Sequence, residues 1–454
     1  MNHLETLRKQ VVADYEQKTP GSRAMFERAS KAMPGGTSGN LRFFPPYPLY
    51  MTSGQGCRTV DVDGASYIDC FSCSGPLLLG HRHPAVMSAL ARVEEVGGLV
   101  VNPVLMVECA EKLQKLIPCA ERVRFLNSGT EAVLTAVRYA RAYTGKPKVI
   151  KFYGQYNGQD DQFLLGKAPN RKPLGRGIPA SSHENTLTLP CNDIAAFDEV
   201  VASRDDIAAV IIDPAWHSGG LWSVPKDYLE ALRARTRAAG IVLIFDEVIT
   251  GFRMGTGGAQ AYHGITPDLT TLAKALSAGD RLAAVVGSAE IMEVTDPTAR
   301  KGVPRVFQSG TGNDASFGLA AALGAMAEYE RLEASDEYHA LWNRVEGLEV
   351  AIRSAFEKQG IGVHVNRFCS LMHMFVTDLE PDYERYLTLN NELLDLVCLG
   401  LINEGVILAF PTSHSSYFSF THDQAAFDEM ATALTTVLEK YPFAEAYQDQ
   451  MLGR

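Results

Sequence analysis

Residues 241–253, Ile-Val-Leu-Ile-Phe-Asp-Glu-Val-Ile-Thr-Gly-Phe-Arg, contain the pattern on which the fold prediction depends. The five apolar residues 241–245 are typical of a strand buried on both faces of a parallel sheet. Asp246 follows at the carboxyl end of this strand, where open α/β sheets bind their ligands. A carboxylate at this place could hold a cationic ring nitrogen. It could equally cap the following turn, because aspartate is common in such loops.

Further apolar runs extend this pattern along the chain, at residues 123–126, 148–152, 208–212 and 283–287. Helical patterns lie between several of them, at residues 131–143 and 226–239. The alternation predicts an α/β fold with a parallel sheet and helices on both faces. Residues 159–190 are polar and rich in glycine and proline, with Lys167, Arg171, Lys172 and Arg176, and they predict a long mobile loop.

A second chemical motif is Pro-Asp-Leu-Thr-Thr-Leu-Ala-Lys at residues 267–274. Lys274 follows an apolar strand, so it is either a surface lysine or a nucleophile. A buried amine near other cations has a depressed pKa and can form a Schiff base.

A third motif is Phe-Leu-Asn-Ser-Gly-Thr-Glu at residues 125–131, ahead of a helical run. A strand, a turn of small residues and a helix start make an anion site, because backbone N–H groups point outward there and the helix dipole favours negative charge. The N–H groups concerned belong to Ser128, Gly129 and Thr130. The alternative is a simple helix N-cap.

Composition narrows the function classes. Of the 454 residues, 46% are hydrophobic and 21% charged, which is typical of a soluble globular protein. The net charge of −11 and the lack of a basic run argue against a nucleic-acid binder. No apolar stretch reaches the roughly 18 residues of a membrane span, and the polar N-terminus is unlike a signal peptide. We therefore expect a cytoplasmic protein without nucleic-acid or membrane partners.

Metal and disulfide chemistry are not expected. The eight cysteines include one Cys-x-x-Cys at Cys70 and Cys73, with no second pair at zinc-finger spacing. Free thiols are therefore expected. His81-Arg-His83 alone is a weak metal signal, and no His-Glu-x-x-His motif occurs.

The three motifs together resemble the class III, fold-type I pyridoxal-phosphate-dependent aminotransferases, in particular the glutamate-1-semialdehyde 2,1-aminomutase branch. The resemblance covers roughly residues 20–440 and is carried by residues 127–132, 243–253 and 267–274. It implies a mostly parallel seven-stranded sheet with helices on both faces and a smaller α+β domain. The expected division is an N-terminal segment packing with the small domain (1–60), a large cofactor-binding domain (61–315) and a small C-terminal domain (316–454).

The resemblance assigns roles to cofactor-binding residues. Lys274 would carry pyridoxal phosphate as an imine and act as the base of the proton shift. Asp246 would pair with the pyridine nitrogen and keep it protonated, so that the ring accepts electrons. The remaining cofactor contacts implied are Ser128, Gly129 and Thr130 at the phosphate, Val248 and Tyr156 on the two ring faces, and Asn157, which stands where the family has histidine.

Substrate and partner contacts follow from the same resemblance. Arg42 aligns with an arginine that holds the substrate carboxylate, although a surface arginine is an equal alternative. Ser74 replaces a large aromatic residue and suggests a roomier pocket. Residues 308–313 resemble a segment that reaches the phosphate of a neighbouring subunit, through either Ser309 or Thr311. A homodimer with shared active sites is therefore expected.

The predicted function is transfer of an amino group between a carboxylate-bearing amino donor and a keto or aldehyde acceptor, through pyridoxamine phosphate. An intramolecular aminomutase is one alternative, and a non-catalytic regulatory protein that binds the cofactor is another. A biosynthetic role is a weaker hypothesis. A nicotinamide dehydrogenase is disfavoured, because two loose Gly-x-Gly-x-x-Ala matches at 175–180 and 310–315 lack the required strand, turn and helix.

Overall fold

The chain divides into two compact units. The computed structural model describes residues 3–165, 173–299, 301–302, 304–380, 382–410 and 414–451. One unit runs from Pro84 to Asp336, and the other combines the residues up to His83 with those from Glu337 onward. The expected boundaries after residues 60 and 315 thus lie N-terminal to the observed ones. The reason is pairing: residues 66–69 form a strand next to residues 406–407, and the helix that begins at Ser316 packs within the central unit.

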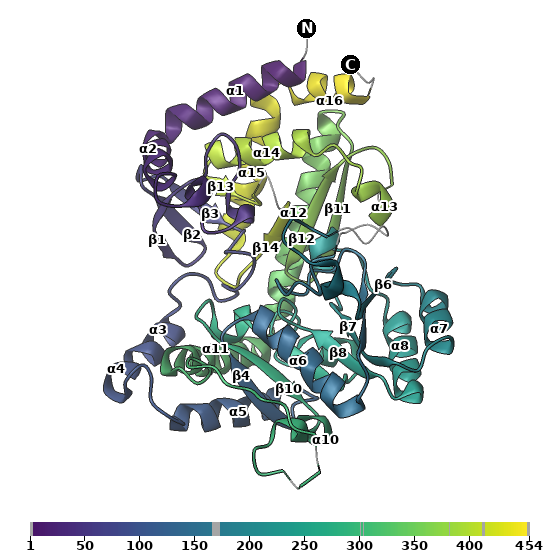
Figure 1. Ribbon diagram of the computed structural model, residues 1–454. Helices are drawn as coiled ribbons and strands as arrows, with labels where there is room; N and C mark the ends of the chain where they lie inside the picture. The colour runs from purple at the N-terminus through teal and green to yellow at the C-terminus, as the bar shows by residue number, and fades with distance from the viewer. Residues whose placement is uncertain are drawn as a thin grey trace. The chain divides into compact units, whose positions relative to one another are not determined.

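The central unit is built on a seven-stranded sheet (Figure 1). Its strand order is β4-β10-β9-β8-β7-β5-β6, and β10 runs antiparallel to both of its neighbours while the other pairs are parallel. This confirms the predicted mostly parallel sheet. The strands are β4 (Arg122–Leu126), β5 (Lys148–Phe152), β6 (Thr186–Leu189), β7 (Ile207–Ile212), β8 (Val242–Asp246), β9 (Leu269–Leu272) and β10 (Ala283–Gly287).

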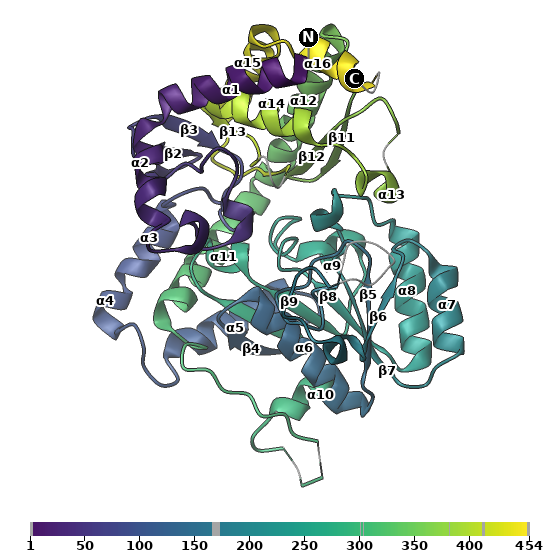
Figure 2. The same ribbon diagram turned by 45° about the horizontal axis from the view of Figure 1, so that its top comes forward.

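Helices cover both faces of this sheet (Figure 2). Strands β7, β8 and β10 are buried along their whole length, which explains their continuous apolar runs. The helices are α3 (Pro84–Ala91), α4 (Val93–Val96), α5 (Val104–Leu116), α6 (Gly129–Thr144), α7 (Ile194–Ala202), α8 (Lys226–Ala239), α9 (Gly258–His263), α10 (Ala289–Met292) and α11 (Ser316–Ala334). Short 3₁₀ turns are η3 (Ala180–His183), η4 (His217–Gly219), η5 (Lys274–Ser277) and η6 (Glu293–Thr295).

The predicted long loop at 159–190 is only partly a loop. It contains η3 and strand β6, which pairs in parallel with β5. The strand Thr-Leu-Thr-Leu is short and half polar, so its pattern alone does not mark it as buried. Residues 166–172, with Lys167, Arg171 and Lys172, lie outside the described residues.

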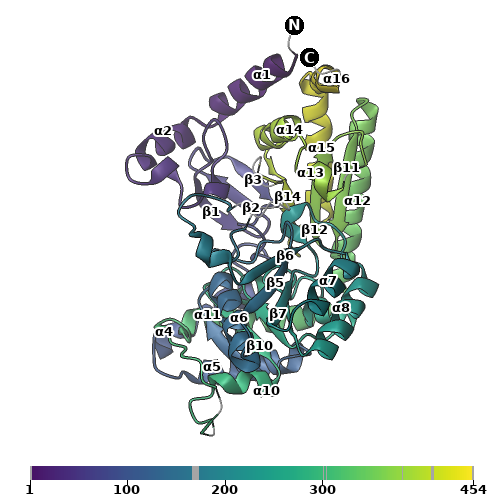
Figure 3. The same cartoon turned by 45° about the vertical axis from the view of Figure 1, so that its right-hand side comes forward.

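The second unit combines the two ends of the chain (Figure 3). Its sheets have the orders β1-β2-β3-β13 and β11-β12-β14. Its strands are β1 (Met51–Gln55), β2 (Arg58–Asp61), β3 (Ser66–Asp69), β11 (Val363–Phe368), β12 (Leu371–Val376), β13 (Val406–Ile407) and β14 (Ser415–Tyr417). Its helices are α1 (His3–Lys18), α2 (Pro20–Ala29), η1 (Pro34–Gly36), η2 (Asn40–Arg42), α12 (Glu337–Lys358), α13 (Tyr383–Tyr386), α14 (Glu392–Asn403), α15 (Gln424–Lys440) and α16 (Phe443–Met451).

Two expectations from composition bear on this fold. All eight cysteines are free thiols, five of them buried, as expected for small apolar side chains. Among the described residues, none of the helices combines the length and the apolar character that crossing a membrane requires.

Candidate active site

Asp246 is a buried carboxylate at the carboxyl end of β8. Its Oδ2 accepts a hydrogen bond from Asn157 Nδ2 at 2.9 Å, and its Oδ1 accepts from Thr271 Oγ1 at 3.0 Å and from Val248 N at 3.3 Å. The last bond means that Asp246 does cap the following turn, which was the alternative from sequence. Burial raises the pKa of Asp246 above its ordinary value, and the hydrogen bond from Asn157 opposes this rise. A cationic group would stabilise its charged form.

Lys274 stands on the strand next to Asp246. Strands β8 and β9 are parallel, with Asp246 paired to Thr271, and Lys274 follows Thr271 by three residues. As a whole residue Lys274 is half-buried, and its amine is the buried part. Burial lowers the pKa of the amine from 10.5 to about 8, with Asp246 opposing this and Arg253 reinforcing it. An amine with this pKa is partly neutral near pH 7–8, which is the nucleophilic form.

The backbone at Lys274 is strained. Its φ of +50° lies in the left-handed region, which a residue with a long side chain rarely adopts. Such conformations cost about 1–3 kcal/mol and are frequent at functional sites. The turn therefore fixes the position and direction in which the Lys274 side chain leaves the backbone.

The start of α6 carries the anion-site motif. Ser128 is the N-cap, and its Oγ accepts from Glu131 N at 3.2 Å. The next N–H groups have no partner inside the helix, and the helix is 16 residues long, so its dipole favours an anion there. Gly129 is needed at the first turn, because an added Cβ would lie 2.9 Å from Val248 Cγ1.

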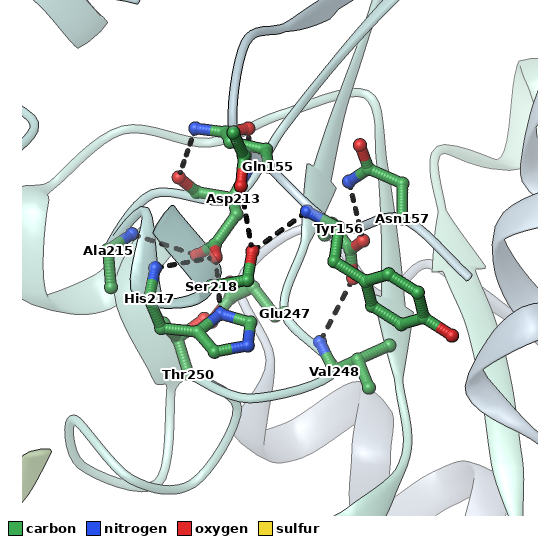
Figure 4. Close-up of polar contacts among 12 residues, drawn as sticks. Gln155, Tyr156, Asn157, Asp213, Ala215, His217, Ser218, Glu247, Val248 and Thr250 are labelled. Carbon is green, nitrogen blue, oxygen red and sulfur yellow. Dashed lines mark hydrogen bonds and ion pairs between the residues drawn. The ribbon is translucent and has the colours of Figure 1, made fainter. Parts of the chain in front are cut away.

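The loop after β5 joins these parts. Gln159 N donates to Thr130 Oγ1 at 3.2 Å, which ties the loop to the start of α6. Asn157 is buried and donates to Asp246; Figure 4 shows it next to Tyr156. Its Oδ1 is buried and, among the described residues, has no hydrogen-bond partner. Tyr156 is 46% exposed, so part of its ring is available to a ligand.

The segment at 308–313 is anchored next to the same helix start. Asn127 Nδ2 donates to Asn313 Oδ1 at 3.0 Å. Ser309 and Thr311 are both exposed. Ser309 also lines a cavity of about 830 Å³ bounded by α5 and β4, whereas Thr311 does not. The choice between the two residues therefore stays a prediction.

The predicted substrate residues belong to the other unit. Arg42 is exposed at the end of η2. Ser74 is half-buried and lies in a left-handed run in which residues 72–75 all have positive φ. Asp69 Oδ1 accepts from Ser72 N at 2.8 Å and helps to hold this run.

Sequence reasoning missed several residues around Asp246. Thr271 lies inside the motif at residues 267–274. Its hydrogen bond to Asp246 could not be predicted without knowing how β8 and β9 are paired. Lys151 is buried on β5, donates to Phe163 O at 2.9 Å, and has its pKa lowered by burial to about 8. Asp213 and His217 form a contact of 2.5 Å in the loop after β7. The spacing of four residues between an aspartate and a histidine was the available signal.

Comparison with known proteins identifies one family. Residues 44–337 match the family model described as aminotransferase class-III. The chain is 36% identical to a glutamate-1-semialdehyde 2,1-aminomutase from Methanopyrus kandleri, over 94% of this chain and 99% of that protein. It also resembles an omega-transaminase from Sphaerobacter thermophilus, with a TM-score of 0.85, 32% identity and coverage of 92% and 97%. A solved transaminase with PLP bound gives a TM-score of 0.85 at 31% identity, covering 95% and 99%.

Proposed function

Because the chain belongs to the class III aminotransferases and is thus a pyridoxal-phosphate-dependent enzyme, we propose that it moves an amino group between a carboxylate-bearing amino donor and a keto or aldehyde acceptor. The observation that carries this proposal is the placement of Asp246 and Lys274 at the carboxyl ends of two paired strands. One group is an anion that lacks a cationic hydrogen-bond donor among the described residues, and the other is an amine with a pKa of about 8.

The residues present fit the cofactor. Asp246 would hold a proton on the ring nitrogen, and Asn157 would keep the carboxylate in place through its 2.9 Å hydrogen bond. The buried Oδ1 of Asn157 still needs a donor, which favours a polar ligand here. Ser128, Gly129 and Thr130 at the start of α6 would bind the phosphate group. Val248 and Tyr156 would flank the ring.

Lys274 Nζ would do the proton transfer. When bound, pyridoxal phosphate supplies a carbonyl that takes up amines and a cationic ring that withdraws electrons from the substrate carbon. Lys274 would hold the cofactor through its amine, and the same amine would serve as the base that takes the proton from the substrate Cα. A pKa of about 8 suits a general base near neutral pH.

Arg42 and Ser74 are the residues that would select the substrate. Arg42 would bind the substrate carboxylate, since a guanidinium matches that group with two parallel hydrogen bonds. Ser74 would leave room for a larger substrate, because the aminomutase branch has a bulky aromatic residue there. This room favours an aminotransferase.

The second candidate is the aminomutase itself. It is favoured by the curated relatives, since the 36% identical protein is a glutamate-1-semialdehyde 2,1-aminomutase matched along almost its whole length. The same residues would serve, with the nitrogen returned to a different carbon of one skeleton. Incubating the purified enzyme with glutamate 1-semialdehyde, and separately with amino donors plus keto acceptors, distinguishes the two candidates. The aminotransferase proposal is rejected if the enzyme only isomerises glutamate 1-semialdehyde and transfers no amino group from any donor.

We also propose that two copies share their active sites. Phe307 is 85% exposed and Val107 is 50% exposed, and both line the cavity beside α5 and Ser309. Exposed apolar side chains gathered at one cavity are typical of a surface that a protein partner covers. Ser309 or Thr311 would then reach the phosphate of the second copy.

The experiment that tests the function is Lys274→Ala. We expect turnover to fall by about 100- to 10,000-fold, the range for losing a general base, and the yellow colour of the lysine-linked cofactor to disappear. Spectra and single-turnover assays with added donors measure both. Unchanged turnover would reject the role of Lys274. Wild-type protein that never converts the cofactor with any donor would favour the regulatory alternative.

A further inference from the structure

Asp213 and His217 form a short contact that the proposed reaction does not use. Asp213 follows β7 and is 2% exposed. Its Oδ1 accepts from Ala215 N at 3.0 Å, and its Oδ2 accepts from His217 N at 3.0 Å (Figure 4). The ring atom His217 Nδ1 lies 2.5 Å from the same Oδ2. A contact this short between a buried carboxylate and an imidazole ring favours the charged pair.

This pair is locked to the loop that holds Asp246. Asp213 N donates to Gln155 Oε1 at 2.8 Å, and Gln155 Nε2 donates back to Asp213 O at 3.1 Å. Tyr156 N donates to Ser218 Oγ at 2.8 Å (Figure 4). The next residue, Asn157, donates to Asp246. The loop after β7 and the loop after β5 therefore position each other.

The two carboxylates also lie at equivalent places on neighbouring strands. Ile212 of β7 pairs with Phe245 of β8, and each is followed directly by its aspartate. Two buried like charges so placed oppose each other's ionisation. In keeping with this, the charge of Asp213 adds to the effect of burial in raising the pKa of Asp246.

We propose that His217 is a positioning residue that neutralises the charge of Asp213, so that Asp246 stays ionised beside the cofactor ring. The proposal rests on the assignment of Asp246 to the ring nitrogen. Through its 2.5 Å contact with Oδ2, His217 supplies the compensating charge at the carboxylate of Asp213, while Asp213 fixes the loop. His217 does not touch the reacting atoms in this scheme.

The electrostatics of Asp213 agree with this role. Burial alone would raise the pKa of Asp213, but the charge of His217 and its hydrogen bond lower it below the ordinary value. The charge of Asp213 also affects other groups. It raises the pKa of Lys274, which follows β9, and the pKa of Cys191, which follows β6. Removing only the cation of the pair would therefore expose all of them to an uncompensated carboxylate.

The test separates charge from hydrogen bonding. His217→Gln keeps a donor but removes the charge, and the double variant Asp213→Asn with His217→Gln removes both charges. The probe is pyridoxamine 5′-phosphate, which has the ring and the phosphate but forms no bond to Lys274. Its dissociation constant is measured by fluorescence titration from pH 5 to 9, together with the melting temperature of each variant.

For His217→Gln we expect an acid-side midpoint raised by about one pH unit and, at pH values below that midpoint, binding about tenfold weaker, since one unit equals a tenfold change. The midpoint rises because an uncompensated Asp213 makes Asp246 easier to protonate. The double variant should return both values to within about threefold of wild type. Asp213→Asn alone should leave the midpoint at or below the wild-type value.

The opposite results overturn the proposal. If His217→Gln has the wild-type midpoint, or if the double variant is weaker than the single one, the pair is only structural. The matched control is His81→Gln, the same change at the pair with Asp69, where His81 Nε2 lies 2.8 Å from Oδ2; it should leave the dissociation constant unchanged. Asp246→Asn tests the site itself. If that variant binds the probe like wild type, the proposed function fails instead.

Discussion

At the scale of single residues, the site is defined by groups held in unfavourable states. Lys274 has a left-handed backbone and an amine whose pKa is lowered to about 8. Asp246 is a carboxylate whose pKa is raised by burial. Each state costs folding free energy and is tolerated where function needs it. The motifs identified both residues from sequence. The pairing of Asp213 with His217 was not identified, because it depends on the turn that brings two residues four apart into contact.

The lowered pKa of Lys274 has a consequence for stability. Below pH 8 the folded protein buries a charged amine, and between about pH 8 and 10.5 only the unfolded chain keeps this proton. Stability of the protein without cofactor should therefore rise with pH across that window. Replacing Lys274 by Met should raise the free energy of unfolding at pH 7 by up to about 3 kcal/mol. The gain should vanish near pH 10.5.

Thermal denaturation of the cofactor-free protein at several pH values measures this gain. Lys358→Met, at an exposed lysine on α12, serves as the control. Its difference from wild type should be equal at pH 7 and pH 10.5. A pH-independent effect of Lys274→Met would contradict the buried, easily deprotonated amine.

At the scale of elements, helix α6 was predicted in position, at residues 131–143 against the observed Gly129–Thr144. The start Ser-Gly-Thr-Glu is visible in sequence because capping depends on local residues. Strand β6 was not predicted, since its burial comes from pairing with β5. The lack of space for a side chain at Gly129 could not be predicted either, because Val248, which approaches it, is distant in sequence.

Removing the cap of α6 should affect both folding and cofactor binding. Ser128→Ala deletes the acceptor for Glu131 N and should cost about 1 kcal/mol of stability. Because the same helix start is proposed to bind phosphate, affinity for pyridoxamine phosphate should fall as well. Asp193→Ala deletes the matching cap of α7, where Oδ1 accepts from Ala196 N at 2.9 Å. That control should lose similar stability and no affinity; equal losses of affinity would argue against the phosphate site.

At the scale of the whole molecule, sequence motifs predicted the architecture better than its boundaries. The central sheet follows from runs of buried residues, whereas the boundary near residue 83 follows from pairing between β3 and β13, which are far apart in sequence. The oligomeric state is harder to predict from the sequence than the domain boundaries are. Exposed apolar residues become a surface only after folding has placed them beside one cavity.

Phe307→Asp tests the proposed association of two copies. Placing a charge at this 85% exposed ring should convert the protein to a monomer and release cofactor, because a partner copy would no longer cover the site. Sedimentation velocity and dialysis measure the two effects. Val350→Asp, at a 63% exposed valine of α12, is the matched control and should keep the wild-type mass. A Phe307→Asp variant with unaltered mass would exclude this surface.

The pairing of Asp246 with Thr271 has a wider consequence. A slip of one residue between β8 and β9 would move one strand by about 3.3 Å and turn its side chains to the opposite face. The distance between Asp246 and Lys274 is therefore set by the backbone hydrogen bonds between β8 and β9, which form whatever the side chains are. The loops that follow the two strands can therefore differ in sequence without moving the carboxylate relative to the amine.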